Sequence, residues 1–316
     1  MSEQEIVYSV THETEYLYQR SVTLSQQLLH MTPRSFTSQE SLAHTLEISP
    51  QPAELSMRPD YFGNLSHWLC VSAPHLRLAV CARSRLLLRR RLQEAQLQGS
   101  PAWEDKRDKL LRTAHLSLRE VAQFCWPSPH VPYALENTEA ACQQLRAYAL
   151  QSFTPRRPLM EAALDLTQRI HRDFEFDSSA TTISTPVSTV FSLRRGVCQD
   201  FAHLMLACLR SLGLACRYVS GYILTTPPPG QPRMIGADAS HAWVSLFCTG
   251  YGWVDFDPTN CCLVQDEHLT VAWGRDFSDV TPMRGVILGG GEQQLQVRVT
   301  VTPEPAASEA AASSSL

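Results

Sequence analysis

The residue pattern of this chain changes twice along its length, and that order of segments constrains the fold more than any other feature. From Tyr8 to about Leu88 the segments are rich in β-branched and aromatic residues and are separated by turn residues, which is typical of strands. Residues 102–175 have helical periodicity, and strand-like segments return beyond Gly213. The order predicts an α+β protein that begins with an antiparallel β-sandwich.

The length of the chain, 316 residues, is sufficient for a sizeable core and for two domains. We predict an N-terminal β domain over residues 1–95 and a second domain, with a helical lead-in, over residues 96–303. Residues 304–316, "EPAASEAAASSSL", have low complexity, and we expect them to form a disordered tail.

The composition is that of a globular protein, because 44% of the residues are hydrophobic and 18% are charged. The net charge of −4 argues against a nucleic-acid partner, and we interpret the basic run "RSRLLLRRRL" as a solvated face. The N-terminus lacks the apolar segment of a secretory signal, and no stretch is long enough to span a membrane. We therefore expect a cytoplasmic location without a membrane partner; the sequence leaves the oligomeric state open.

Ten cysteines are scattered along the chain without a C-x-x-C pair, so we expect free thiols in a reducing compartment. Cys261 and Cys262 with His268 form a weak zinc pattern, because a second cysteine pair is lacking. We predict no metal and no cofactor.

Cys198 stands at the start of an amphipathic helix in "RRGVCQDFAHLMLACLRSLG". The unpaired N–H groups and the dipole at a helix N-terminus favour an anion, and therefore favour a nucleophilic thiolate. The alternative is that Cys198 is a small buried hydrophobe, as Cys208 is expected to be within the same helix. Asp200, in the first helical turn, suits the dipole equally well as a structural residue.

Two later strands, "SHAWVSLFC" and "GWVDFD", flank the turn sequence "TGYG" and predict a β-hairpin. A three-residue loop, 249–251, closes on Cys248 and Gly252 and places Asp257 diagonal to His241 on the same face. Asp255 satisfies the same parity. An aspartate beside a histidine fixes the imidazole tautomer, although either residue can also be purely structural.

The segments "RRGVCQDFAHLMLACLRSLGLACRYVSGY", "DASHAWVSLF" and "GWVDFDPTN" resemble the core of the bacterial transglutaminase-like proteins, a branch of the papain-like cysteine hydrolase superfamily. The strand-rich start, including "RPDYFGN", resembles the N-terminal region of that family, and "GRDFSDVTPMRGV" is similar to its downstream part. The resemblance implies a papain-like transglutaminase core of helices packed on an antiparallel sheet. It also implies that Cys198 is the nucleophile, His241 the base and Asp257 the orienting acid.

The function implied by the resemblance is acyl transfer from a protein or peptide amide through a thioester. Water as acceptor gives an amidase or peptidase, and an amine gives a transglutaminase. The alternative from another class is a peptide-binding or scaffold protein without activity. The Cys198 N–H is the expected oxyanion donor, while Gln199 and Trp243 are candidate substrate-binding residues. We expect the loop over residues 225–239 to border the cleft.

Overall fold

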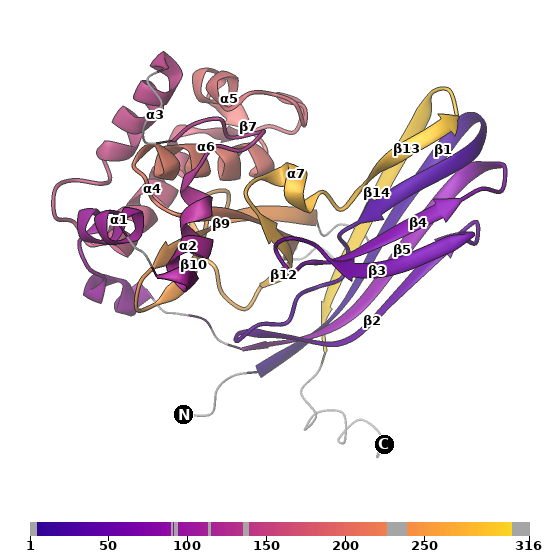
Figure 1. Cartoon of the computed structure of the whole chain (residues 1–316), viewed down its shortest axis with the longest axis horizontal. Helices are drawn as coiled ribbons and strands as arrows, with labels where there is room; N and C mark the ends of the chain where they lie inside the picture. The colour runs from indigo at the N-terminus through magenta and orange to yellow at the C-terminus, as the bar shows by residue number, and fades with distance from the viewer. Residues whose placement is uncertain are drawn as a thin grey trace, which may run out of the picture.

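The computed structural model describes residues 5–89, 91, 94–112, 115–134, 139–225 and 239–304. An elongated antiparallel sheet packs beside a compact unit of helices and a smaller sheet, as Figure 1 shows. The prediction of an α+β fold is therefore confirmed. Within the described ranges, no helix is both long and apolar enough to cross a lipid bilayer.

The elongated sheet has seven strands, five of them from the N-terminal part of the chain. These five are β1 (Glu5–Leu29), β2 (Gln39–Ser49), β3 (Glu54–Pro59), β4 (Leu65–Val71) and β5 (His75–Arg89), in the order β2-β5-β1-β4-β3. The other two, β13 (Met283–Gly289) and β14 (Gln293–Pro303), both pair with β1.

Strand β1 explains why this sheet is not divided into the two sheets of the predicted sandwich. Its first half lies between β5 and β14, and its second half lies between β4 and β13. The pairing with β5 is interrupted between Leu17 and Val22, where β1 changes neighbours. Because one strand of 25 residues belongs to both halves, the hydrogen bonding is continuous.

The C-terminal strands correct the predicted domain boundary. We expected residues 96–303 to form one unit, but β13 and β14 belong to the N-terminal sheet. Val299 and Val301 are buried against the common core together with Tyr8 and Val10 of β1, so their apolar side chains lie between the two units. The predicted tail falls, except for Glu304, outside the described residues.

The second unit consists of helices around a five-stranded antiparallel sheet of order β11-β10-β9-β8-β12. Its helices are η1 (Glu94–Gly99), α1 (Trp103–Leu111), α2 (Leu116–Ala122), η2 (Gln123–Cys125), α3 (Ala140–Leu150), α4 (Leu159–Asp173), α5 (Val187–Leu193), α6 (Cys198–Ser211) and α7 (Phe277–Val280). Its strands are β6 (Glu175–Phe176), β7 (Arg195–Gly196), β8 (Cys216–Ile223), β9 (Ala239–Cys248), β10 (Gly252–Asp257), β11 (Cys262–Leu263) and β12 (His268–Gly274).

Helix α6 is the central element of this unit. From Asp200 to Ser211 every residue is buried, and the helix packs against β8 and β9 and against α3, α4 and α5. It ends at Ser211, and Gly213, whose φ is +76°, allows the amides of Gly213 and Leu214 to bond the carbonyls of Arg210 and Leu209. A helix fixed along its whole length holds its first residue, Cys198, in a defined position.

Two side-chain amides join the N-terminal sheet to the edge strand β12. The Gln39 amide donates to the Thr270 carbonyl at 2.7 Å and accepts the Thr270 N–H at 2.8 Å. The Asn64 amide bonds the Trp273 carbonyl and N–H in the same way, at 2.9 and 3.0 Å. Each amide thus takes the place of a neighbouring strand, and the free edge of the smaller sheet is covered.

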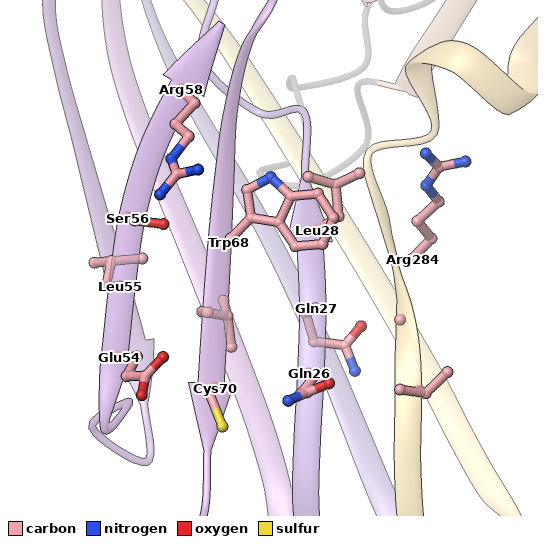
Figure 2. Close-up of a pocket in the computed structure, with 13 residues that line it drawn as sticks. Gln26, Gln27, Leu28, Glu54, Leu55, Ser56, Arg58, Trp68, Cys70 and Arg284 are labelled. Carbon is pink, nitrogen blue, oxygen red and sulfur yellow. The ribbon is translucent and has the colours of Figure 1, made fainter. Parts of the chain in front are cut away.

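The outer face of the N-terminal sheet carries a groove of about 660 Å³ across β1, β3, β4 and β13. Figure 2 shows Trp68 beside Leu28 in this groove, with Arg58 and Arg284 toward the same end. None of the candidate catalytic residues lines it.

Replacing Gln39 by alanine should destabilise the whole molecule, because it leaves the buried N–H and carbonyl of Thr270 unpaired. We expect a loss of about 2 to 4 kcal/mol in the free energy of unfolding, measured by urea denaturation. Gln294→Ala, at an exposed position of β14, is the matched control and should change it by less than about 0.5 kcal/mol. Equal small effects of both variants would contradict the role assigned to Gln39.

Candidate functional site

Cys198 is the first residue of α6, and the turn before it is fixed by Asp200. The Asp200 Oδ2 atom accepts the Val197 N–H at 2.9 Å and the Thr181 hydroxyl at 2.6 Å. Gly196 is required because a Cβ there would lie 2.7 Å from the same oxygen. Burial raises the pKa of Asp200, while these bonds lower it. Asp200 therefore shapes the turn that presents Cys198.

His241 lies on β9, and the predicted register of the following hairpin is confirmed. Cys248 pairs with Gly252, so the loop has three residues and Asp257 falls on the same face as His241. The His241 Nε2 atom lies 2.7 Å from Asp257 Oδ2. Asp255, which satisfied the same parity, bonds Trp243 and Arg91 instead.

The Asp257 carboxylate is completely buried and accepts five hydrogen bonds. Oδ2 accepts from His241, from His268 at 2.9 Å and from the Asn260 side chain at 2.7 Å. Oδ1 accepts from the backbone N–H groups of Thr259 and Asn260. Burial raises the pKa of Asp257, but the two histidines lower it more strongly, and the net pKa lies well below the usual range. Asp257 is therefore a permanent anion.

His241 is charged at neutral pH as a consequence. Burial lowers the pKa of its imidazole, but hydrogen bonds to Asp257 and to Cys198 raise it, and the net pKa is about 10. Since Nε2 faces Asp257, Nδ1 is the nitrogen left for the thiol of Cys198. The arrangement provides a proton donor beside a sulfur at a helix N-terminus.

His268 is the residue that sequence analysis missed at this site. It lies on β12, at the edge of the sheet, yet its Nε2 atom bonds Asp257 at the end of β10. Burial lowers the pKa of His268 more than Asp257 raises it, so this imidazole is neutral. One carboxylate therefore holds two histidines in opposite protonation states. Little in the sequence indicates that His268 contacts Asp257, because the two residues lie on strands that are not hydrogen-bonded neighbours.

Trp243 does not line the cleft, contrary to the expectation. Its side chain is wholly buried, with its ring 6.1 Å from that of His241 and 5.2 Å from that of His268. The indole N–H donates to Asp255 at 3.3 Å, and Arg91 bonds the same oxygen at 2.6 Å. Alternation along β9 places Trp243 on the same face as His241, where it packs beside the imidazole.

Gln199 lies beside Cys198, where its side-chain amide donates to the Ile183 carbonyl at 3.4 Å. This bond ties the segment before α5 to the start of α6. Of the loop expected to border the cleft, residues 226–238 lie outside the described residues.

Among the described residues, His241, Asp257 and His268 form the group whose ligand atoms converge enough to hold a metal ion, within 4.8 Å of one another. Their hydrogen bonds, at 2.7 and 2.9 Å, already engage the converging atoms. Cys261 and Cys262, half-buried and not joined in a disulfide, are not part of this group.

Comparison with known proteins shows the family of this chain. The family model of the bacterial transglutaminase-like N-terminal region matches residues 8–86, and that of the transglutaminase-like superfamily matches residues 146–258. The chain belongs to the transglutaminase-like superfamily. The second match contains Cys198, His241 and Asp257 of the transglutaminase-like core.

Two relatives of this transglutaminase-like chain extend over almost its whole length. An uncharacterized protein of Mycobacterium tuberculosis is 41% identical over 304 residues, covering 94% of this chain and 92% of that protein. An uncharacterized protein of Mycobacterium leprae is 31% identical, covering 93% and 97% respectively.

The fold is similar to a solved structure described as a "Putative Cysteine Protease" from Cytophaga hutchinsonii. The TM-score is 0.74 at 17% identity, over 96% of this chain and 92% of that chain. At that level of identity the likeness concerns the fold, and it includes the N-terminal sheet as well as the transglutaminase-like core.

The two histidines should titrate far apart. In NMR spectra of protein labelled with ¹⁵N-histidine, His241 should keep both ring protons at neutral pH and lose one near pH 10, while His268 stays neutral at pH 7. Because folding raises the pKa of His241 above 6.5, the protonation of His241 stabilises the folded protein. This stabilisation is complete below pH 6.5 and is lost as the pH rises through 10. A His241 titration near 6.5 would contradict the assignment.

Proposed function

We propose that the protein catalyses thiol-dependent acyl transfer from protein or peptide amides, with Cys198 as nucleophile, His241 as acid and base, and Asp257 as the orienting acid. The observation that carries the proposal is the double engagement of His241: Asp257 bonds its Nε2 atom, and the thiol of Cys198 contributes to its raised pKa. A histidine held between a buried carboxylate and a sulfur at a helix N-terminus is the arrangement that acyl transfer requires.

The first half of the proposed reaction forms a thioester. The Cys198 thiolate attacks the amide carbon, and the carbonyl electrons move to oxygen, where the Cys198 N–H stabilises the oxyanion. When the carbonyl re-forms, the C–N bond breaks, and the His241 imidazolium gives its proton to the departing nitrogen. His241 is then neutral, with Asp257 still holding its orientation.

The second half of the reaction releases the acyl group. Neutral His241 takes a proton from the attacking water or amine, the C–S bond breaks, and the Cys198 thiolate is restored beside the imidazolium. We favour water as the acceptor, because water at about 55 M competes unless a cleft excludes it. Hydrolysis makes the protein an amidase or peptidase.

His268 has the role of a positioning residue in this proposal. Its N–H bond to Asp257 Oδ2 adds to the bonds from Thr259 and Asn260 that hold the carboxylate, and it also makes the carboxylate less basic. A less basic Asp257 lets His241 release its proton to the leaving group more readily.

Mass spectrometry of a peptide library incubated with the protein, with and without a primary amine, tests the reaction. We expect cleaved or deamidated peptides in both conditions and no products with Cys198→Ala. Cys261→Ala is the matched control and should retain full activity, because Cys261 is half-buried but outside the site. Amine adducts as the main product would identify a transglutaminase, while products formed equally by Cys198→Ala would overturn the proposal.

Replacing His268 tests its positioning role. His268→Phe should lower kcat about tenfold with little change in KM, since it removes a bond to Asp257 and contacts no substrate. The basic limb of the pH profile should move to higher pH, because a more basic Asp257 raises the pKa of His241. His268→Gln, which retains an N–H donor, should recover part of kcat. An unshifted pH profile of His268→Phe would indicate that His268 has only a structural role.

A further inference from the structure

Arg217, on β8, is stacked between aromatic rings at the end of the smaller sheet remote from Cys198. Its guanidinium carbon lies 3.6 Å from the centre of the Trp273 ring and 4.3 Å from that of Trp253. The Arg34 guanidinium lies 3.7 Å from the Trp273 ring, and two such groups cannot share one face of an indole. With both of its own faces occupied by indoles, Arg217 is left with its in-plane N–H groups for hydrogen bonding.

Arg217 lines a cavity of about 590 Å³. Across β9, His241 pairs with Gly221 and Ser245 pairs with Arg217, a separation of four residues or about 13 Å along the strand. The cavity is therefore distinct from the catalytic site. Its lining is mostly aromatic and aliphatic, with two cations, one carboxylate and three hydroxyls: Phe36, Thr37, Ser38, Arg91, Arg217, Tyr251, Gly252, Trp253, Val254, Asp255, Leu263, Val264 and Trp273.

Hydrogen-bonding groups beside this cavity are left without partners. Arg217 is buried, with 8% of its surface exposed, yet in the described part of the chain its guanidinium forms no hydrogen bond or ion pair, and Nε is orphaned. Arg91 Nε and Ser245 Oγ are orphaned as well. Arg217, Ser245 and Asp255 occupy adjacent positions across β8, β9 and β10, so the orphaned groups are clustered. Burying a guanidinium whose N–H groups lack acceptors is costly, and a bound carboxylate would supply those acceptors.

We propose that this cavity binds a small organic carboxylate, held in the plane of the Arg217 guanidinium. The two oxygens of a carboxylate match two parallel N–H groups of arginine, and the apolar lining accommodates a hydrocarbon or aromatic body. Two cations and one carboxylate line the cavity, so the lining has a single positive charge in excess. A monoanion neutralises that charge, whereas a phosphate dianion leaves a negative charge unpaired.

Acetate, benzoate and hippurate are suitable probes, with hippurate methyl ester and inorganic phosphate as controls. Binding is measured by calorimetry with the Cys198→Ala protein, and the site is identified from the ¹⁵Nε resonance of Arg217, assigned by its loss in Arg217→Lys. We expect at least one aromatic carboxylate to bind and to shift that resonance, and neither control to do so. Arg217→Met should weaken binding about tenfold or more, since a charge-assisted bond is lost.

Arg85→Met is the matched control and should bind as the parent does, because Arg85 is half-exposed on β5 and pairs with Glu304. If Arg217→Met does not fold, a second measurement replaces the test with this variant. The bound carboxylate should then protect Arg217 from modification by phenylglyoxal, as mapped by mass spectrometry. The proposal is overturned if no carboxylate shifts the Arg217 resonance at about 10 mM, ten times a millimolar Kd. Tighter binding of phosphate, or undiminished binding by Arg217→Met, also overturns it.

Discussion

The buried carboxylate of Asp257 is the interaction on which the candidate site depends. It lies where the end of β10 meets β12 and accepts five hydrogen bonds, so its negative charge is compensated without solvent. The charge of this carboxylate keeps His241 protonated, and the same carboxylate accepts a hydrogen bond from the N–H of neutral His268. Without it, two buried imidazoles would lose their common partner, and the smaller sheet would lose a link between strands that are not neighbours in its ladder.

Around this carboxylate, the N-terminal sheet contributes to the core rather than standing apart from it. Gln39 and Asn64 cover the edge of β12, and Arg91, which follows β5, bonds Asp255 and the His268 carbonyl. His12 of β1 bonds the Tyr222 hydroxyl of β8 at 2.8 Å. These contacts hold the strand that carries His268, so we expect the two units to fold as one cooperative body.

The sequence was sufficient to predict the parts of the site that depend on residues close together along the chain. The helix start at Cys198 follows from a glycine, an acidic first turn and an apolar face, and the hairpin register follows from loop length and strand parity. Pairing between strands that lie far apart in the sequence follows no such rule. For this reason β13 and β14, which pair with β1, were assigned to the wrong unit. His268 was missed for a related reason, since only the path of the whole sheet brings β12 to the end of β10. Trp243 was predicted to bind substrate, but the sequence pattern could not show that its side chain is completely buried.

Formation of the acyl-enzyme, followed in single-turnover experiments with a peptide thioester or activated ester, tests the central claim most directly. Intact-protein and peptide mass spectrometry measure the rate at which one acyl group appears on Cys198, in the unmodified protein and in Asp257→Asn. The account predicts one equivalent on Cys198 and a rate lower by about a hundredfold or more in Asp257→Asn, because His241 loses its orienting anion. An acyl group on another residue, or an unchanged rate in Asp257→Asn, would contradict it.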